Sequence, residues 1–272
     1  MMSGRDIILE LVLKHEGRWD DIYSAIKNKN RPGGDLVKEY KEKGGTDFVT
    51  ILDKNYPNEF KYANKPPFLF FYRGDLSLLG EEKRTISFVG SREASKYGLD
   101  MTKKIVKGLV ESGITICTGL ARGIDAMAAK TALDMGGKVI CVLGNGIDFC
   151  YPSSSSDLYE RASKLGLVIS EYPFNTPPNK ENFPARNRMV AALGSGVVVG
   201  EASKRSGTLI TTAFALSLNK EVGCVPYPAD ANSGCNMLIK EGAYMVENAD
   251  DVLLMIGATK KNEIAKNISN SL

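Results

Sequence analysis

Short apolar runs rich in β-branched residues alternate with amphipathic segments from residue 85 to about residue 256. The runs are nearly continuous, which indicates strands buried on both faces of a sheet, and glycines stand at many of the joins. We expect strands at 86–90, 114–119, 138–144, 167–171, 196–202, 221–226 and 243–246. We expect helices near 97–112, 123–135, 156–165, 186–193, 208–219, 234–241 and 248–256. This alternation predicts an α/β fold of the extended Rossmann-like, doubly wound kind, with a mostly parallel sheet.

The first part of the chain has a different pattern. Residues 47–79 are rich in aromatic residues and prolines, and the run FLFFYRG within them predicts an extended strand, so we interpret this stretch as edge strands of the main sheet. The N-terminal 45 residues hold two or three short helical patterns. We therefore expect a small helical domain at 1–45, an extended Rossmann-like domain at 46–257 and a polar tail at 258–272.

Composition narrows the class of protein. Of 272 residues, 43% are hydrophobic and 25% charged, as in ordinary globular proteins. No apolar run approaches the roughly 20 residues that span a bilayer, and the N-terminal apolar stretch is interrupted by Glu10. The five cysteines show no C-x-x-C pairing, and the single histidine, His15, lies far from every glycine-rich loop. We expect a cytoplasmic protein with reduced thiols, no membrane contact, no metal site and no cofactor.

The loop after the strand at 86–90 is the first candidate site. In open α/β sheets, ligands bind beyond the carboxyl ends of the strands, near helix N-termini. Gly90 permits close approach of a ligand to the backbone, Ser91 and Ser95 offer hydroxyls, and Arg92 can bind a phosphate through two parallel hydrogen bonds. The alternative is an ordinary turn with a helix cap and a surface arginine.

Two further loops place glycines, hydroxyls and arginines at strand ends. The candidate residues in them are Gly119, Arg122, Ser206, Gly207 and Thr208. Asp125 opens the helix after the first of these loops and could simply complement the helix dipole. Several such loops on one edge of a sheet would form a cradle for one phosphate or for a line of phosphates.

The segment 177–190 combines positive charge with an aromatic ring. Lys180, Arg186 and Arg188 supply the charge and Phe183 supplies the ring. Single-stranded nucleic acid suits this combination, because cations follow the backbone while a base stacks on the ring. The alternative is that Phe183 packs inward and the arginines are solvated. The net charge of +3 says little about partners, so the placement of cations is the stronger indication.

Several enzyme motifs are missing. The chain has no G-x-x-x-x-G-K-[ST] and no G-x-S-x-G, and Gly144-Asn145-Gly146 provides only part of a dinucleotide-binding fingerprint. Glu171 and Glu201 follow strands and could act as acid–base groups. We favour instead a role for both in anchoring loop amides or a neighbouring arginine.

Seven ordered segments carry a family resemblance: GSREASKYG, TGLARGIDAMAAKTAL, VLGNGIDFCYP, GLVISEYP, FPARNRMVAAL, VVVGEASKRSGTLIT and NMLIKEGA. Together they resemble the DNA-processing protein A (DprA, also called Smf) family over about residues 47–255. The resemblance implies a recombination mediator without enzymatic activity. Such a protein binds and protects incoming single-stranded DNA and loads the recombinase RecA during natural transformation, acting as a homodimer.

The resemblance also implies roles for particular residues. The positions that match its DNA-binding motifs are Gly90, Ser91, Arg92, Lys180 and Phe183, followed by Arg186, Asn187 and Arg188. The positions implied at the dimer and partner interface are Met237, Leu238, Ile239 and Met245. Residues 1–45 would correspond to a sterile-α-motif-like domain. Tyr227 stands where the family usually has glycine.

Two enzyme classes are the alternatives. A nucleotide-processing, phosphoribohydrolase-like enzyme would use a related Rossmann-like fold, but its P-G-G-x-G-T-x-x-E signature is replaced here by RSGTLIT at 205–211. A nicotinamide-dependent oxidoreductase would need the complete glycine fingerprint.

Overall fold

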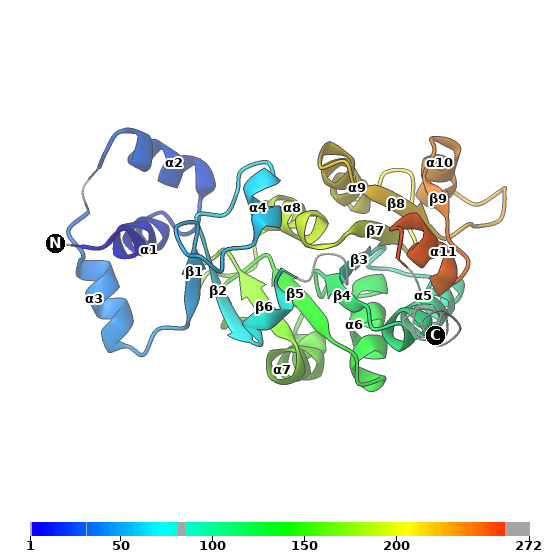
Figure 1. Ribbon diagram of the computed structural model, residues 1–272, viewed down its shortest axis with the longest axis horizontal. Helices are drawn as coiled ribbons and strands as arrows, with labels where there is room; N and C mark the ends of the chain where they lie inside the picture. The colour runs from blue at the N-terminus through cyan, green and yellow to red at the C-terminus, as the bar shows by residue number, and fades with distance from the viewer. Residues whose placement is uncertain (1, 31, 81–84, 259–272) are drawn as a thin grey trace, which may run out of the picture.

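One sheet organises the molecule. The computed structural model describes residues 2–30, 32–80 and 85–258, so the predicted tail at 258–272 lies outside the described residues except for its first position. The strands are β1 (Phe48–Thr50), β2 (Leu69–Gly74), β3 (Thr85–Val89), β4 (Thr115–Thr118), β5 (Val139–Leu143), β6 (Leu167–Ser170), β7 (Gly196–Val199), β8 (Glu221–Cys224) and β9 (Tyr244–Met245). Across the described ranges they form one sheet in the order β1-β2-β6-β5-β4-β3-β7-β8-β9 (Figure 1).

The directions of the strands confirm the predicted fold class. Strands β3 to β9 pair in parallel. Strand β2 pairs antiparallel with both β1 and β6, so the aromatic stretch adds an antiparallel edge to the parallel sheet. Every residue of β3, β4, β5, β6 and β7 is buried, which explains why their sequences are continuous apolar runs rather than alternating ones.

Helices cover both faces of the sheet. The helices are α1 (Gly4–Lys14), α2 (Trp19–Lys27), α3 (Asp35–Glu42), α4 (Asn58–Tyr62), α5 (Lys96–Glu111), α6 (Ile124–Asp134), α7 (Ser156–Leu165), α8 (Asn182–Leu193), α9 (Thr208–Ser217), α10 (Gly234–Lys240) and α11 (Ala249–Met255), with short 3-10 turns η1 (Leu76–Leu78) and η3 (Ser153–Ser155). Buried residues of α5, α6, α7 and α11 belong to one hydrophobic cluster, and those of α4, α8, α9 and α10 belong to a second. No helix in the described part of the chain is long and apolar enough to cross a membrane.

Helix α8 begins earlier than the sequence pattern indicates. It starts at Asn182 rather than near residue 186. Pro184 lies in its first turn, where proline is tolerated because the first amide groups of a helix have no intrahelical partner. The earlier start places Phe183 on the helix itself, so its ring is held by regular backbone.

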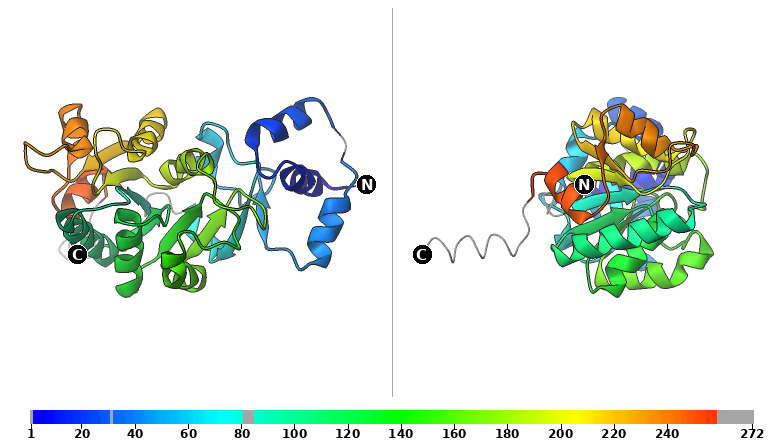
Figure 2. Two further views of the ribbon diagram at one scale, coloured as in Figure 1. Left: turned by 180° about the vertical axis from the view of Figure 1, so that it is seen from behind. Right: turned by 90° about the vertical axis from the view of Figure 1, so that its right-hand side faces the viewer.

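The N-terminal helices pack against the aromatic edge of the sheet. Trp19 stacks on Phe68 with ring centroids 5.1 Å apart, and its indole N–H donates to the carbonyl of Pro66 at 2.7 Å. The Nζ of Lys65 donates to the carboxylate of Asp20 at 2.6 Å. Figure 2 shows helices α1 to α3 at one end of the molecule and α10 and α11 at the other. The division at residue 45 stays a prediction.

Candidate functional site

The sheet reverses its strand order beside β3. From β3 the chain adds β4, β5 and β6 on one side, and then β7, β8 and β9 on the other. Ligands of open α/β sheets bind in the crevice at such a switch point, because the loops on its two sides diverge there. A groove of about 680 Å³ lies at this place.

The groove brings most of the predicted residues together. Those that line it are Gly90, Ser91, Arg92, Arg122, Lys180, Phe183, Arg186, Asn187, Ser206, Gly207 and Thr208. They come from the loops after β3, β4, β6 and β7, from the first two turns of α8 and from the start of α9. Gly119 lines an adjoining pocket of about 370 Å³ together with Arg92 and Phe183. Four separate loops therefore meet in one hollow.

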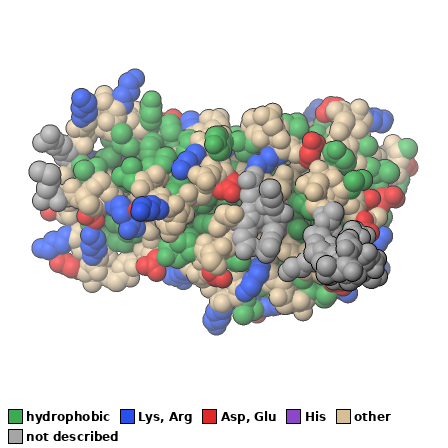
Figure 3. Space-filling view, in the orientation of Figure 1, with side chains coloured by type: hydrophobic (Ala, Val, Ile, Leu, Met, Phe, Trp, Pro, Cys, Tyr) green, Lys and Arg blue, Asp and Glu red, His purple; other side chains and the backbone are tan. Residues whose placement is uncertain are grey.

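Three cations in the groove are exposed and unpaired. Arg92, Arg122 and Lys180 form no ion pair with a carboxylate in residues 2–30, 32–80 and 85–258. The guanidinium carbon of Arg92 lies 5.2 Å from the centroid of the Phe183 ring, which is a cation–π distance. Glu93 and Asp125 also line the groove, but neither forms an ion pair with these three cations. On the face shown in Figure 3, Lys and Arg side chains are interspersed with Asp and Glu. Unpaired cations that share one groove favour an anionic ligand.

Arg186 forms the floor of the groove rather than an exposed contact. It is 4% exposed, and its Nη1 donates to the carbonyl of Gly119 at 2.8 Å and also to the carbonyl of Val142. Burial lowers the pKa of Arg186, and the neighbouring carboxylate of Asp125 opposes this effect. A methyl group at position 119 would lie 2.4 Å from this guanidinium, so glycine is needed for the close approach. The charge of Arg186 thus acts from below the surface.

Asp125 fastens two of the loops together. Its carboxylate accepts from the amide of Gly90 at 3.2 Å and from the amide of Gly119 at 3.0 Å. The amide of Ser91 donates to the carbonyl of Glu201 at 2.7 Å. The amides of Gly90 and Ser91 are therefore used within the chain. A phosphate at this loop would be bound through the Arg92 side chain and the Ser91 hydroxyl.

Ser95 lies outside the groove. Its hydroxyl donates to Oε2 of Glu201 at 2.7 Å and accepts from the amide of Gly98 at 3.1 Å, capping α5. The hydroxyl of Tyr227 donates to the same carboxylate oxygen at 3.0 Å. Glu201 therefore anchors the loop before α5, as we favoured from the sequence, and we leave Ser95 out of the proposed contact surface.

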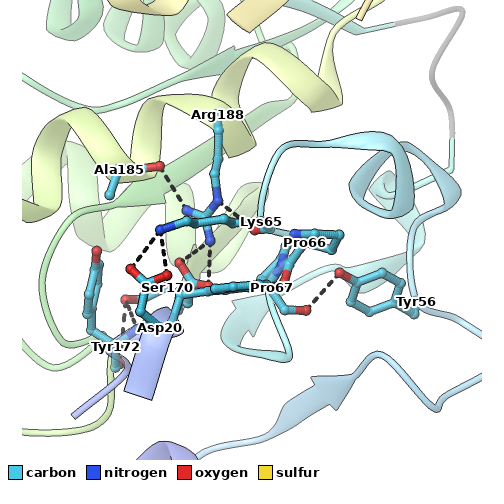
Figure 4. A network of polar contacts seen from close by, with 11 residues as sticks. Asp20, Tyr56, Lys65, Pro66, Pro67, Ser170, Tyr172, Ala185 and Arg188 are labelled. Carbon is cyan, nitrogen blue, oxygen red and sulfur yellow. Dashed lines mark hydrogen bonds and ion pairs between the residues drawn. The ribbon is translucent and has the colours of Figure 1, made fainter. Parts of the chain in front are cut away.

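Arg188 also lies outside the groove, because a buried partner holds it. Its Nη2 donates to both carboxylate oxygens of Glu171, at 2.6 and 2.7 Å, and the two side chains are 6% and 7% exposed. Its Nε donates to the carbonyl of Lys65 and its Nη1 to the carbonyl of Ala185, each at 2.8 Å (Figure 4). Arg188 joins α8 to the segment that carries the N-terminal helices, so it belongs to the scaffold and not to the proposed contact surface.

The ring of Phe183 is placed by a glycine and by a second aromatic residue. A methyl group at position 144 would lie 2.7 Å from Cδ1 of Phe183, which gives Gly144 a packing role unrelated to dinucleotide binding. The ring of Tyr151 stacks on Phe183 with centroids 5.5 Å apart and planes at 29°. Sequence reasoning missed Tyr151; its position in a loop beyond the carboxyl end of β5 was the available signal.

The residues expected at a dimer interface divide into two groups. Leu238 is 8% exposed and packs in the hydrophobic cluster beneath α10, so it is a core residue. Met237 and Ile239 are half-buried, while Met245 is 53% exposed on the edge strand β9. Tyr244 and Leu254 add further exposed apolar surface at the same end of the sheet.

Comparison with known sequences finds relatives of one family. The chain is 42% identical over 206 residues to DNA processing protein DprA of Streptococcus pneumoniae, covering 75% of this chain and 72% of that protein. It is 37% identical over 227 residues to protein Smf of Synechocystis, covering 82% of this chain but only 57% of the relative.

Solved structures agree as well. The structure of DNA processing protein A from Streptococcus pneumoniae superposes with a TM-score of 0.78 at 35% identity, over 92% of each chain. That from Helicobacter pylori, described for its single-stranded DNA binding mode, gives a TM-score of 0.70 at 26% identity, over 82% of this chain and 97% of that one. The sequence profile described as DNA recombination-mediator protein A matches residues 47–257. This chain therefore belongs to the DNA recombination-mediator protein A family.

Proposed function

We propose that the groove binds single-stranded DNA without regard to sequence. The observation that carries this proposal is the meeting of Arg92, Arg122 and Lys180, all unpaired among the described residues, with the half-buried ring of Phe183 in one hollow. Cations that contact phosphates and a ring that stacks on a base make no use of base edges, and so such contacts do not select a sequence. The solved Helicobacter pylori relative, with its single-stranded DNA binding mode, supports the same function.

Uncharged residues at the start of α9 also belong to the proposed phosphate-binding surface. Ser206, Gly207 and Thr208 line the groove where this ten-residue helix begins. The amides of Thr208, Leu209 and Ile210 already donate to Ser206 and Gly207, so the contribution of this turn is the positive end of the helix dipole. A phosphate bound between Arg92 and this turn would be held by the cation and favoured by the dipole.

We propose that this protein binds DNA and assists recombination without catalysing a reaction itself. The two carboxylates that follow strands are both engaged, Glu171 by Arg188 and Glu201 by Ser95 and Tyr227, which supports structural roles for them. We propose further that the bound strand is passed to RecA during DNA uptake, and that the protein works in the cytoplasm.

We also propose a homodimer that uses the end of the sheet at β9. The exposed side chain of Met245 and the half-buried Met237 and Ile239 support this surface. Replacing Met245 by arginine is expected to shift the protein to monomer in sedimentation velocity while its circular dichroism spectrum remains that of the folded protein. Leu238→Arg should instead unfold the protein, because it buries a charge. A dimer that survives Met245→Arg would place the interface elsewhere.

The groove is tested by oligo-dT binding with matched charge reversals. Arg92→Glu should weaken binding strongly and reduce the slope of log Kd against log salt, since each phosphate contact on a single strand contributes about 0.7 to that slope. Lys107→Glu is the matched control. Lys107 is an exposed cation in the second half of α5, whereas the groove lies near the N-terminus of that helix. Equal losses at the two positions would contradict the proposal.

A further inference from the structure

A second pocket adjoins the groove and shares six of its residues. This pocket, of about 370 Å³, has in common with the groove Arg92, Ala121, Arg122, Tyr151, Phe183 and Arg186. Its outer wall comes from the segment between β5 and α7, where Tyr151 is followed by a run of serines. Its volume is within the range of about 300–1,000 Å³ that small-molecule sites occupy. So far the only role of Tyr151 is to support the Phe183 ring, and the serines of this wall have none.

Tyr151 is placed as a platform rather than as a core residue. It is 44% exposed, and its hydroxyl makes no hydrogen bond within residues 2–30, 32–80 and 85–258. A buried tyrosine usually covers its ring and pairs its hydroxyl, and Tyr151 does neither. Its ring is nevertheless held in position, because it stacks on Phe183 at 5.5 Å and 29°. A positioned ring that is open to solvent suits stacking with a base.

The charges around this pocket have one sign. Arg92, Arg122 and Arg186 line it, and no carboxylate from the described part of the chain does. Ser153 and Ser154, which are both exposed, also line it. Hydroxyls and unpaired arginines are common contacts of phosphate oxygens. The pocket therefore provides both a ring for a base and donors for a phosphate.

We propose that the DNA strand in the groove continues into this second pocket, where the next base stacks on Tyr151 and its phosphate is bound by Arg122 and the hydroxyls of Ser153 and Ser154. The occupant is a nucleotide of the same strand, because Arg92 and Phe183 border both spaces and leave them continuous. This inference rests on the proposed single-strand binding and extends it from one stacked base to two consecutive ones. Tyr151 is thus a second base-binding residue.

The test places one abasic site at each position in turn along the shortest oligo-dT that wild type binds at full affinity. Stacking contributes about 1–3 kcal/mol per base, which is about 5- to 150-fold in Kd. Two adjacent positions should therefore lose about that much affinity when the base is absent. In Tyr151→Ala one of the two positions should become insensitive while the other keeps its loss. Tyr151→Phe should keep both, and its salt dependence should equal that of wild type.

A second measurement needs no variant. 2-Aminopurine placed at the same two positions should be quenched on binding to wild type, since stacking on an aromatic ring quenches it. Only one sensitive position in wild type would overturn this inference while leaving the proposed function intact. A Tyr151→Ala protein that loses sensitivity at both positions would also overturn it, because Tyr151 would then act only by supporting Phe183. Failure of wild type to bind oligo-dT at all would defeat the proposed function itself.

Discussion

Removing the carboxylate of Glu171 should destabilise the protein strongly. The side chains of Glu171 and Arg188 are each less than a tenth exposed, and two hydrogen bonds of 2.6 and 2.7 Å join the guanidinium to the carboxylate. Glu171→Ala leaves that cation buried without its counter-charge, and breaking such a pair costs about 3–5 kcal/mol. For a chain of this size, about 2–4 °C of melting temperature accompanies each kcal/mol. The expected fall is therefore about 6–20 °C.

The assay is thermal unfolding followed by circular dichroism, with a double variant as the control. Glu171→Leu combined with Arg188→Met removes both charges and should lose less stability than Glu171→Ala alone, because no unpaired cation remains. The carbonyls of Lys65 and Ala185 lose their donors in the double variant, which accounts for a residual cost of about 1–3 kcal/mol. A melting temperature for Glu171→Ala equal to that of wild type would refute the reasoning, as would a double variant less stable than the single one.

Two more predictions concern the groove. Gly144→Ala should displace the Phe183 ring, because the added methyl group would lie 2.7 Å from its Cδ1. Oligo-dT titrations should then show weaker binding with an unchanged salt slope. An unaltered Kd would show that the ring does not contact the DNA. Burial raises the pKa of Asp125 above its ordinary value of 3.8. Above pH 3.8 the folded state therefore binds more protons at this group than the unfolded state does. As a result, the contribution of Asp125 to the free energy of unfolding falls as pH rises. Urea unfolding at several pH values should therefore show wild type losing stability relative to Asp125→Asn as pH increases from 4, and a constant or growing advantage of wild type would contradict this.

The strands were predictable because their signal is local. Continuous apolar runs such as 138–144 are determined by burial on both faces, and the structure has a buried strand, β5, within that range. The short strand β1, three residues in an aromatic loop, and the first turn of α8 carried weaker signals. Their limits depend on tertiary pairing and on a proline that a helix accepts only at its start.

The loops of the site were predictable for a related reason, while the roles of single charges were not. Parallel strands bring their carboxyl ends to one edge, so glycine and hydroxyl loops from distant positions had to meet. Arg92 and Arg188 look alike in the sequence, yet one is exposed in the groove and the other is paired with Glu171. That difference depends on a partner far away in the chain, which no local pattern reveals. Tyr151 was missed because a tyrosine before a proline reads as an ordinary turn residue.

The position of β3 between β4 and β7 has a consequence for synthesis of the protein. Its neighbour on one side follows directly in the chain, but its neighbour on the other side is β7, where Ser87 pairs with Val197. Contacts so distant in sequence form late, since the loop-closure entropy must be overcome first. During translation, β7 and α9, which form one wall of the groove, are made only after the part of the chain that ends at β6. The proposed DNA-binding groove is therefore complete only once α9 has been made.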